Sequence, residues 1–380
     1  MIFLVWRRLW PLFVCTAALG LVTVMLGPLL PALITRWHIR DAQAGTLFTA
    51  SFIGQLIGAW FATRNLRLSL LAGAGLAVLG VATLAWAGFP LAHLAFFITG
   101  LGVSAGITAG NVISGYSSPH RARALALFNV SWSIGAIACP LLVRFAGPAN
   151  TRLFFLVAAA IVAVGGALAA TLLRPPTMDA PTTPPVAGSV SAPSLAALLL
   201  FAGCMLLYIG NENALGGWLP SFAVRSNPQA HASTIAMLYW LSELISRLVM
   251  AAVAWRVSEA ALYRASLTLL LAIVVFFVLI PHPSLPTLMG AVILSGVAIG
   301  PVYPLLVAFL LARFSTYPGL GRLFASASLG GATLPWLTGV VSTHFGGLRI
   351  GLLVPAAGIL LMLALSHAVV PARLQAISQT

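Results

Sequence analysis

Stretches of about twenty apolar residues recur along the whole chain, and they restrict the possible folds more than any other feature of the sequence. Only 6% of the 380 residues are charged, whereas a typical soluble domain carries about 25%. A chain with so few charges cannot cover a water-exposed surface. Because about 20 apolar residues cross the hydrocarbon core of a bilayer as a helix, we predict an all-α membrane protein.

Hydropathy, with breaks at Arg, Pro and polar clusters, predicts twelve transmembrane helices. Most connections between them are too short to hold a domain of their own. The predicted spans, numbered 1 to 12 in chain order, are 9–35, 42–63, 67–88, 91–117, 124–146, 151–173, 194–224, 231–256, 260–280, 284–313, 319–345 and 348–371.

One connection, residues 174–193, differs from the rest. It is rich in Pro, Thr, Ser and Ala and has no apolar periodicity, so we predict a flexible linker. It lies near the middle of the chain. The prediction is therefore an N-terminal six-helix bundle at 1–173 and a C-terminal six-helix bundle at 194–380, the two being pseudo-symmetric.

Three short motifs of the first half recur in the second half, in the same order and at a nearly constant spacing. Internal duplication of this kind is the build of many secondary transporters. The matched pairs are Gly102-Val103-x-x-Gly106 with Gly296-Val297-x-x-Gly300, Gly135 to Pro140 with Gly330 to Pro335, and Leu30-Pro31 with Leu219-Pro220.

The net charge of +14 comes from arginines at the ends of spans, not from a basic face or tail. Twice as many of them lie on the side of the N-terminus as on the other side, which the positive-inside rule assigns to the cytoplasm. We therefore predict cytoplasmic termini and a cytoplasmic linker, and no nucleic-acid partner. The Arg- and Ala-rich composition and the short loops favour a bacterial inner membrane.

Span 7 carries Glu212, one of only two acidic residues inside the predicted spans. A charge in mid-membrane costs about 2.5–3.5 kcal/mol on insertion scales, so such a residue normally faces a cavity or a partner. Asn211 and Asn213 flank it, Tyr208 lies one turn before it, and Trp218 follows further along. Amides and carboxylates bind sugar hydroxyls, while aromatic rings contact sugar C–H faces. We predict a role in solute or proton binding; the alternative is a bond to a neighbouring helix.

Span 8 carries the second acidic residue, Glu243, four residues before Arg247 and one turn after Trp240. Opposite charges at this spacing meet on one helix face and lower the cost of burying each other. The pair is either a structural ion pair or a site where Glu243 exchanges a proton. Alignment of the two halves places Arg247 opposite Gln55 of span 2.

Further polar and aromatic residues inside predicted spans are candidates for solute contact. Asn129 and Trp132 of span 5 are three residues apart, which suits an amide and an indole facing one cavity. Helix packing or interfacial anchoring explains each of these residues equally well. The others are Gln55, Asn111, Trp240, Tyr303 and Trp336, whereas Asp41 is predicted to lie solvated in a loop.

The junction of spans 2 and 3, Gly54-Gln-Leu-Ile-Gly58-Ala-Trp-Phe-Ala-Thr-Arg64-Asn-Leu-Arg67, resembles the G-x-L-a-D-R-x-G-R-R loop motif of the major facilitator superfamily. Ala62 stands in place of the motif's aspartate and Asn65 in place of its glycine. The resemblance implies twelve helices in two bundles that work by alternating access. Spans 1, 4, 7 and 10 then line the pathway, with help from spans 2, 5, 8 and 11. A gating ion pair through the motif's aspartate is not expected here.

Three stretches resemble the fucose-permease-like sugar porters within that superfamily: Tyr208 to Pro220, Gly300 to Pro304, and Gly330 to Trp336. Those relatives are proton symporters with acidic residues in spans 1 and 4. Here both spans lack Asp and Glu, and Asn111 is the nearest polar substitute in span 4.

The resemblance implies a secondary transporter of a monosaccharide or a similar small polar solute, with Glu212, Glu243 and Arg247 as candidates for proton coupling. An uncoupled sugar facilitator, or an exporter of drugs or amphipathic metabolites, remains an alternative. The sequence has no nucleotide-binding P-loop, no catalytic motif and no paired spacing for a metal. We therefore expect a monomer without enzymatic activity, cofactor or metal, whose partners are the bilayer, a small molecule and protons.

Overall fold

The computed structural model describes residues 2–62, 64–116, 121–147, 149–173, 194–253, 257–314 and 320–370. The predicted linker at 174–193 lies outside the described residues. The described parts hold sixteen α-helices and no strand, which confirms the predicted fold class. In chain order they are α1 (Ile2–Thr23), α2 (Leu26–Trp37), α3 (Asp41–Phe61), α4 (Leu66–Leu84), α5 (Phe89–Tyr116), α6 (Arg121–Ala146), α7 (Thr151–Leu172), α8 (Leu195–Ser226), α9 (Ala232–Val253), α10 (Glu259–Leu279), α11 (Leu285–Ile299), α12 (Val302–Phe314), α13 (Leu320–Ser326), α14 (Ser328–His344), α15 (Leu348–Gly351) and α16 (Leu353–Val369).

Four pairs of consecutive helices each form one broken span, so the sixteen helices correspond to the twelve predicted spans. Ten segments of the described chain are long and apolar enough to cross a bilayer, and α1 with α2 makes an eleventh, bent by 42°. α13 with α14 covers the predicted span 319–345 but is not one of these segments. Proline explains two of the breaks, because Pro28 and Pro301 cannot donate a backbone bond and clash with the carbonyl four residues before.

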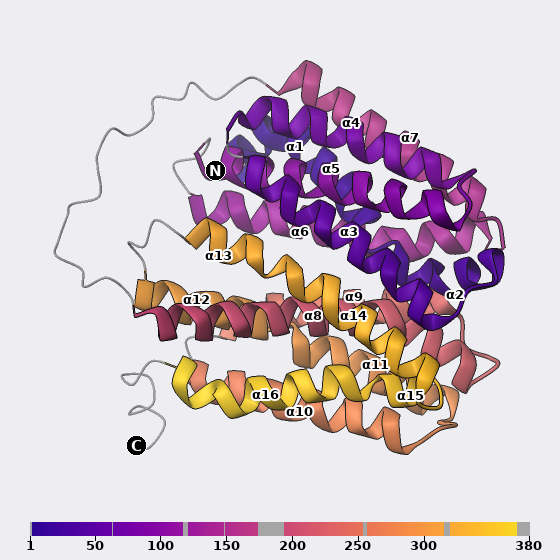
Figure 1. Cartoon of the computed structure of the whole chain (residues 1–380). Coiled ribbons are helices and arrows are strands. Elements are labelled where there is room, and N and C mark those ends of the chain that lie inside the picture. Colours follow the sequence, from indigo (N-terminus) through magenta and orange to yellow (C-terminus); the bar gives the residue numbers. More distant parts are fainter. Residues whose placement is uncertain are drawn as a thin grey trace.

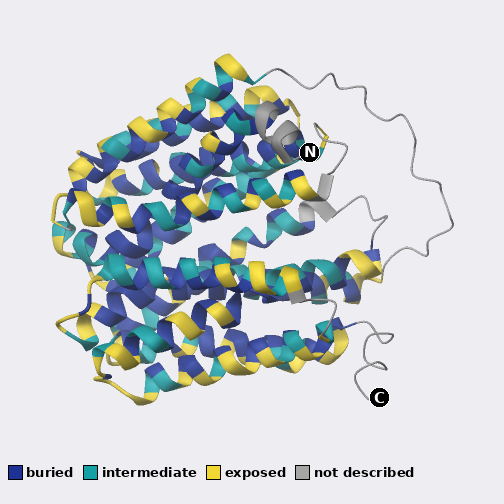
Figure 2. Ribbon diagram, turned by 180° about the vertical axis from the view of Figure 1, so that it is seen from behind, coloured by how far each residue is buried: buried dark blue, intermediate teal, exposed yellow. Residues whose placement is uncertain are grey.

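The helices form two bundles, α1–α7 and α8–α16, which lie one above the other in Figure 1. In each bundle most of the buried core consists of Leu, Phe, Ala and Val, and many large apolar side chains are exposed. Figure 2 shows exposed residues along the outer faces of the helices. Outward-facing apolar side chains are what a lipid environment requires, because lipid tails are as apolar as the side chains themselves.

The two bundles meet chiefly along α2 with α8, α3 with α14 and α6 with α9, and α2 with α9 and α3 with α13 also make contact. The backbones approach closely there. A Cβ on Gly27 would lie 2.4 Å from the carbonyl oxygen of Gly216, and one on Gly45 would lie 2.9 Å from the Cα of Trp336. These contacts extend from the middle of the bundle to the end that lies away from the first and last described residues (Figure 1).

The predicted repeat has a counterpart in the packing. A Cβ on Gly135 would lie 1.8 Å from the carbonyl oxygen of Ala17 in span 1, and a Cβ on Gly330 would lie 1.8 Å from that of Leu206 in span 7. The two glycines occupy equivalent places in the repeat, and so do the carbonyls that they contact. Span 5 therefore packs on span 1 as span 11 packs on span 7.

This packing predicts that Gly135→Ala and Gly330→Ala both destabilise the protein. Each new methyl group would overlap a backbone carbonyl that cannot rotate away, and overpacking of this kind costs about 1–3 kcal/mol. Gly75→Ala is the matched control, because a Cβ there meets nothing within 4 Å. Thermal unfolding in detergent should give a lower midpoint for Gly135→Ala and Gly330→Ala, but not for Gly75→Ala. An unchanged midpoint would contradict the close helix contacts.

Candidate functional site

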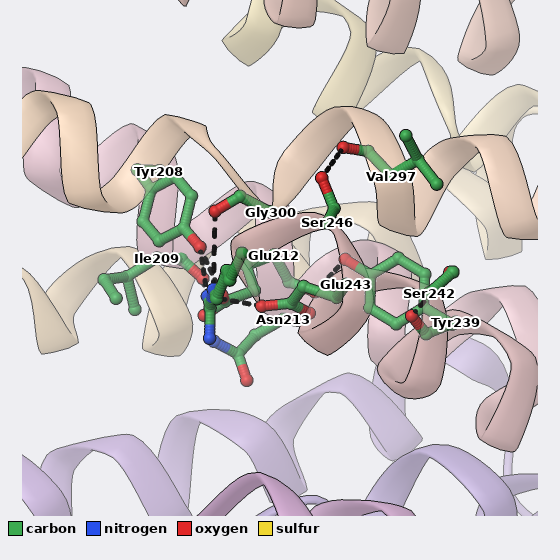
Figure 3. Close-up of polar contacts among 11 residues, drawn as sticks. Tyr208, Ile209, Glu212, Asn213, Tyr239, Ser242, Glu243, Ser246, Val297 and Gly300 are labelled. Carbon is green, nitrogen blue, oxygen red and sulfur yellow. Dashed lines mark hydrogen bonds and ion pairs between the residues drawn. The ribbon is translucent and has the colours of Figure 1, made fainter. Parts of the chain in front are cut away.

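Two carboxylates in the middle of the C-terminal bundle share one arginine. The Nη2 atom of Arg247 lies 2.9 Å from Oε1 of Glu212 and also contacts Oε1 of Glu243. It donates to the hydroxyl oxygen of Tyr208 at 3.0 Å, and that hydroxyl donates to Glu212. We call these four residues, which come from α8 and α9, the Arg247 cluster. Figure 3 shows Tyr208, Glu212 and Glu243 of this cluster. The predicted contact of Glu243 with Arg247 is confirmed.

Local helix geometry places these side chains. Tyr208 and Glu212 are four residues apart on α8, and so are Glu243 and Arg247 on α9, so each pair lies on one helix face. The Nε atom of Arg247 also donates to the carbonyl of Gly300 at 3.4 Å. That carbonyl lies at the break between α11 and α12, where the last carbonyls of a helix lack intrahelical donors.

The glycine motif of span 10 brings α9 close enough for this arrangement. A Cβ on Gly296 would lie 2.4 Å from the carbonyl oxygen of Tyr239, and one on Gly300 would lie 2.9 Å from that of Glu243. The predicted repeat motif therefore supports the backbone that carries Glu243.

The charges in the cluster are buried and unequal in number. Glu243 is 1% exposed and Glu212 is 8% exposed, while the Arg247 side chain is half-buried. The second carboxyl oxygen of Glu243 has no hydrogen-bond donor among the described residues. One guanidinium can balance only one of two ionised carboxylates. Because an uncompensated buried charge is costly, the cluster is suited to taking up one further positive charge.

Aromatic rings surround the cluster, and one of them comes from the other bundle. The Tyr208 ring lies 5.3 Å from that of Tyr303, and the Tyr239 hydroxyl donates to the backbone oxygen of Glu212 at 3.3 Å. The indole of Trp240 lies edge-to-face with Trp132 of α6, at 6.0 Å between centroids. The N-terminal bundle therefore reaches the site through an aromatic contact.

Two of the residues predicted to bind solute together with Glu212 lie elsewhere. The Asn211 amide packs against Gly358 of α16 and points its nitrogen at the sulfur of Met362, 3.8 Å away. Trp218 is fully buried and donates from its indole nitrogen to the carbonyl of Pro335 at 2.8 Å. In this structure both side chains join α8 to neighbouring helices.

The remaining candidates lie on the helices predicted for them, but no hydrogen bond between described residues joins them to the Arg247 cluster. Asn213 and Asn129 donate to carbonyls of their own helices, those of Ile209 and Leu125. Gln55 and Asn111 are half-buried on α3 and α5, and Trp336 of α14 is exposed.

An ion pair that the sequence did not predict joins the two bundles at their far end, which is the end away from the first and last described residues. Asp41, which begins α3, is buried instead of solvated: its two oxygens each lie 2.7 Å from a nitrogen of Arg225, at the end of α8. The Ser342 hydroxyl of α14 also donates to Asp41. We call these three residues the far-end latch. The only signal for it was that Asp41, just before predicted span 2, and Arg225, just after predicted span 7, lie on the same predicted side of the membrane.

Comparison with known proteins identifies the family of this chain. Residues 12–318 match the sequence model of the Major Facilitator Superfamily, which is most of the chain. The chain belongs to this superfamily. It is therefore a multi-pass membrane transporter and not an enzyme.

Similar proteins include a xylose transporter and a nucleoside transporter. The xylose transporter XylE from E. coli, in an inward-open conformation, has a TM-score of 0.79 and 10% identity, covering 97% of this chain and 96% of that one. The nucleoside transporter NupG has a TM-score of 0.73 and 15% identity, covering 95% and 99%. Bypass of stop codon protein 6 from Saccharomyces cerevisiae is 24% identical over 86% of this chain and 75% of its own length.

The far-end latch should hold this transporter closed at that end. In Asp41→Asn the charge-assisted bonds to Arg225 are weakened, so arrangements open at that end should become more populated. The Arg225 side chain is 42% exposed, and solvent screening limits the pair to about 1 kcal/mol, which corresponds to about a fivefold shift.

Maleimide labelling of Thr49→Cys measures this shift, because the Thr49 hydroxyl is bonded across the interface to the carbonyl of Ala332, and the three native cysteines are buried. Labelling should rise about fivefold when Asp41→Asn is added. The charge-reversed pair, Asp41→Arg with Arg225→Asp, should return labelling to the level seen with the native ion pair. Arg40→Gln serves as the neighbouring control. Equal labelling in all backgrounds would mean that the ion pair does not hold the bundles together.

Proposed function

We propose that this transporter is a proton symporter of a monosaccharide or a similar small polar solute. The observation that carries the proposal is the Arg247 cluster, in which two buried carboxylates face one guanidinium. The cluster lies in the middle of span 7, at the depth where transporters of this type bind solute and coupling ion.

Charge balance gives the coupling mechanism. With Glu212 and Glu243 both ionised, the cluster carries a net negative charge that favours contact with water over closure around the site. One bound proton makes the cluster neutral. The two carboxyl groups meet at one nitrogen atom, so they take up this proton as a pair and not as independent sites. With the proton bound, the transporter then changes between its inward-open and outward-open states.

The solute binds beside Glu212, on the more exposed side of the Arg247 cluster. Glu212 is the more exposed of the two carboxylates, and it can accept a hydrogen bond from a solute hydroxyl while Arg247 turns to Glu243. The rings of Tyr208, Tyr303, Trp240 and Trp132 offer flat apolar surface to a sugar ring. Gln55, Asn111 and Asn129 are the candidates for polar contacts from the N-terminal bundle.

The proposed orientation places both termini in the cytoplasm of a bacterial cell, on the basis of the arginine distribution. The far-end latch is then on the periplasmic side. With the bundles joined at that end, the described arrangement is the inward-facing one, from which proton and solute leave to the cytoplasm.

Uptake of radiolabelled D-glucose, D-xylose, L-fucose and D-mannitol into proteoliposomes tests the proposal. With one proton per solute, an inward gradient of one pH unit supports accumulation up to about tenfold. Equal downhill uptake with and without the gradient would contradict proton coupling and leave an uncoupled facilitator. Failure to take up any member of the panel would contradict the assignment to sugars and polyols.

A further inference from the structure

Trp240 carries a buried hydrogen-bond donor that no described residue of the protein pairs. Trp240 is 5% exposed, and its indole nitrogen has no acceptor among the described residues. Two other indoles of the chain are paired: Trp37 donates to the carbonyl of Ala87 at 3.2 Å, and Trp218 donates to that of Pro335. A buried donor without a partner costs about 1–3 kcal/mol, so its presence calls for a reason.

Packing fixes where this donor lies. A Cβ on Gly216 would lie 2.8 Å from Cζ2 and 3.3 Å from Cη2 of Trp240, so this edge of the indole rests on α8 at Gly216. Cζ2 is attached to the same ring carbon as the indole nitrogen, and the N–H group therefore lies along this edge. Gly216 is one turn after Glu212 on the same helix face. The unpaired donor is thus next to the Arg247 cluster.

Residues of the N-terminal bundle close over the same place. Trp132 meets the Trp240 ring at 86°, and Gly27 of α2 approaches the backbone of Gly216. Tyr239, 5.1 Å from the Trp240 ring, holds it from the side. The indole is therefore fixed between the two bundles and cannot turn its N–H group to water without separating them.

We propose that the Trp240 N–H group donates to one hydroxyl oxygen of the transported solute, and that Trp240 thereby determines which polyols the transporter accepts. The inference rests on the proposed function. The donor and the carboxylate of Glu212 lie one turn apart on the wall of one site, which suits a solute with neighbouring hydroxyls. One hydroxyl accepts from the indole and the next donates to the carboxylate. Trp132 covers the pair from the other bundle, so the bound solute joins the two halves.

Trp240→Phe tests the inference, because phenylalanine keeps an aromatic ring against Trp132 but removes the N–H group. Uptake of the member of the sugar and polyol panel that the wild type transports, and of its monodeoxy analogues, would be compared in both proteins. Trp240→Phe should raise KM about three- to tenfold, with little change in kcat. Trp86→Phe, at an exposed indole outside the site, is the control.

The deciding result is a coupling between variant and analogue. In the wild type, the KM of one deoxy analogue should exceed that of the parent solute by about the factor by which Trp240→Phe raises the KM of the parent. In Trp240→Phe, the KM values of that analogue and of the parent should be equal. If both proteins discriminate equally against every analogue, the N–H group contacts no solute hydroxyl, and the inference fails while the proposed function stands. If the wild type transports no member of the panel, both fail.

Discussion

Glu243→Gln should abolish accumulation driven by a proton gradient and leave solute exchange across the membrane intact. Glutamine has nearly the shape of glutamic acid but cannot release a proton, so the variant cluster holds one carboxylate and one guanidinium and is permanently neutral. Accumulation in a gradient of one pH unit should fall from about tenfold to none, while counterflow stays within about twofold of the wild type. Radiolabelled uptake and counterflow in the same proteoliposomes measure both quantities.

Glu212→Gln should lose accumulation in the same way, with a higher KM as well, because Glu212 is the more exposed carboxylate and is proposed to contact solute. Glu259→Gln is the matched control: Glu259 begins α10 and is the remaining acidic residue of the described C-terminal bundle. Retained accumulation in Glu243→Gln and Glu212→Gln alike would contradict proton coupling through the cluster.

Arg247→Met should be the most destabilising single substitution in the site. It leaves Glu212 and Glu243 buried beside each other with no positive charge, and removal of one partner from a buried ion pair costs about 3–5 kcal/mol. Thermal unfolding in detergent should give a markedly lower midpoint. Arg144→Met, at an exposed arginine near the end of α6, should have little effect.

A triple variant separates charge from shape. Adding Glu212→Gln and Glu243→Gln to Arg247→Met removes all three charges, and well-packed neutral replacements of buried ion pairs are often tolerated. The midpoint should recover most of its loss, although transport should not. A triple variant as unstable as Arg247→Met alone would mean that Arg247 stabilises the bundle through its packing and its bond to Gly300, and not through the two carboxylates.

The spans could be predicted from the sequence because each depends on local composition alone, and the repeat could be predicted because Gly135 and Gly330 perform the same packing role in each half. The contact between Glu243 and Arg247 was predictable because helix geometry fixes side chains four residues apart. Glu212 joins the same arginine from another helix. That contact depends on the register of α8 against α9, which the sequence does not state.

The same limitation explains the positions of Asn211 and Trp218. Their spacing from Glu212 suggests one helix face, but the faces of α8 that pack on α16 and α14 are defined only by the assembled bundle. Asp41 was expected in water because its partner, Arg225, is far away in the sequence and belongs to the other half. Contacts between the two halves are therefore what sequence reasoning misses most easily.

The most direct test of proton symport is to measure the proton itself. Wild-type proteoliposomes loaded with the pH-sensitive dye pyranine, with no gradient imposed at the start, would be mixed with the transported sugar or polyol. Proton symport through the cluster predicts acidification of the interior in step with solute uptake, at one proton per solute, and none in Glu243→Gln. Solute uptake by the wild type without acidification would contradict it.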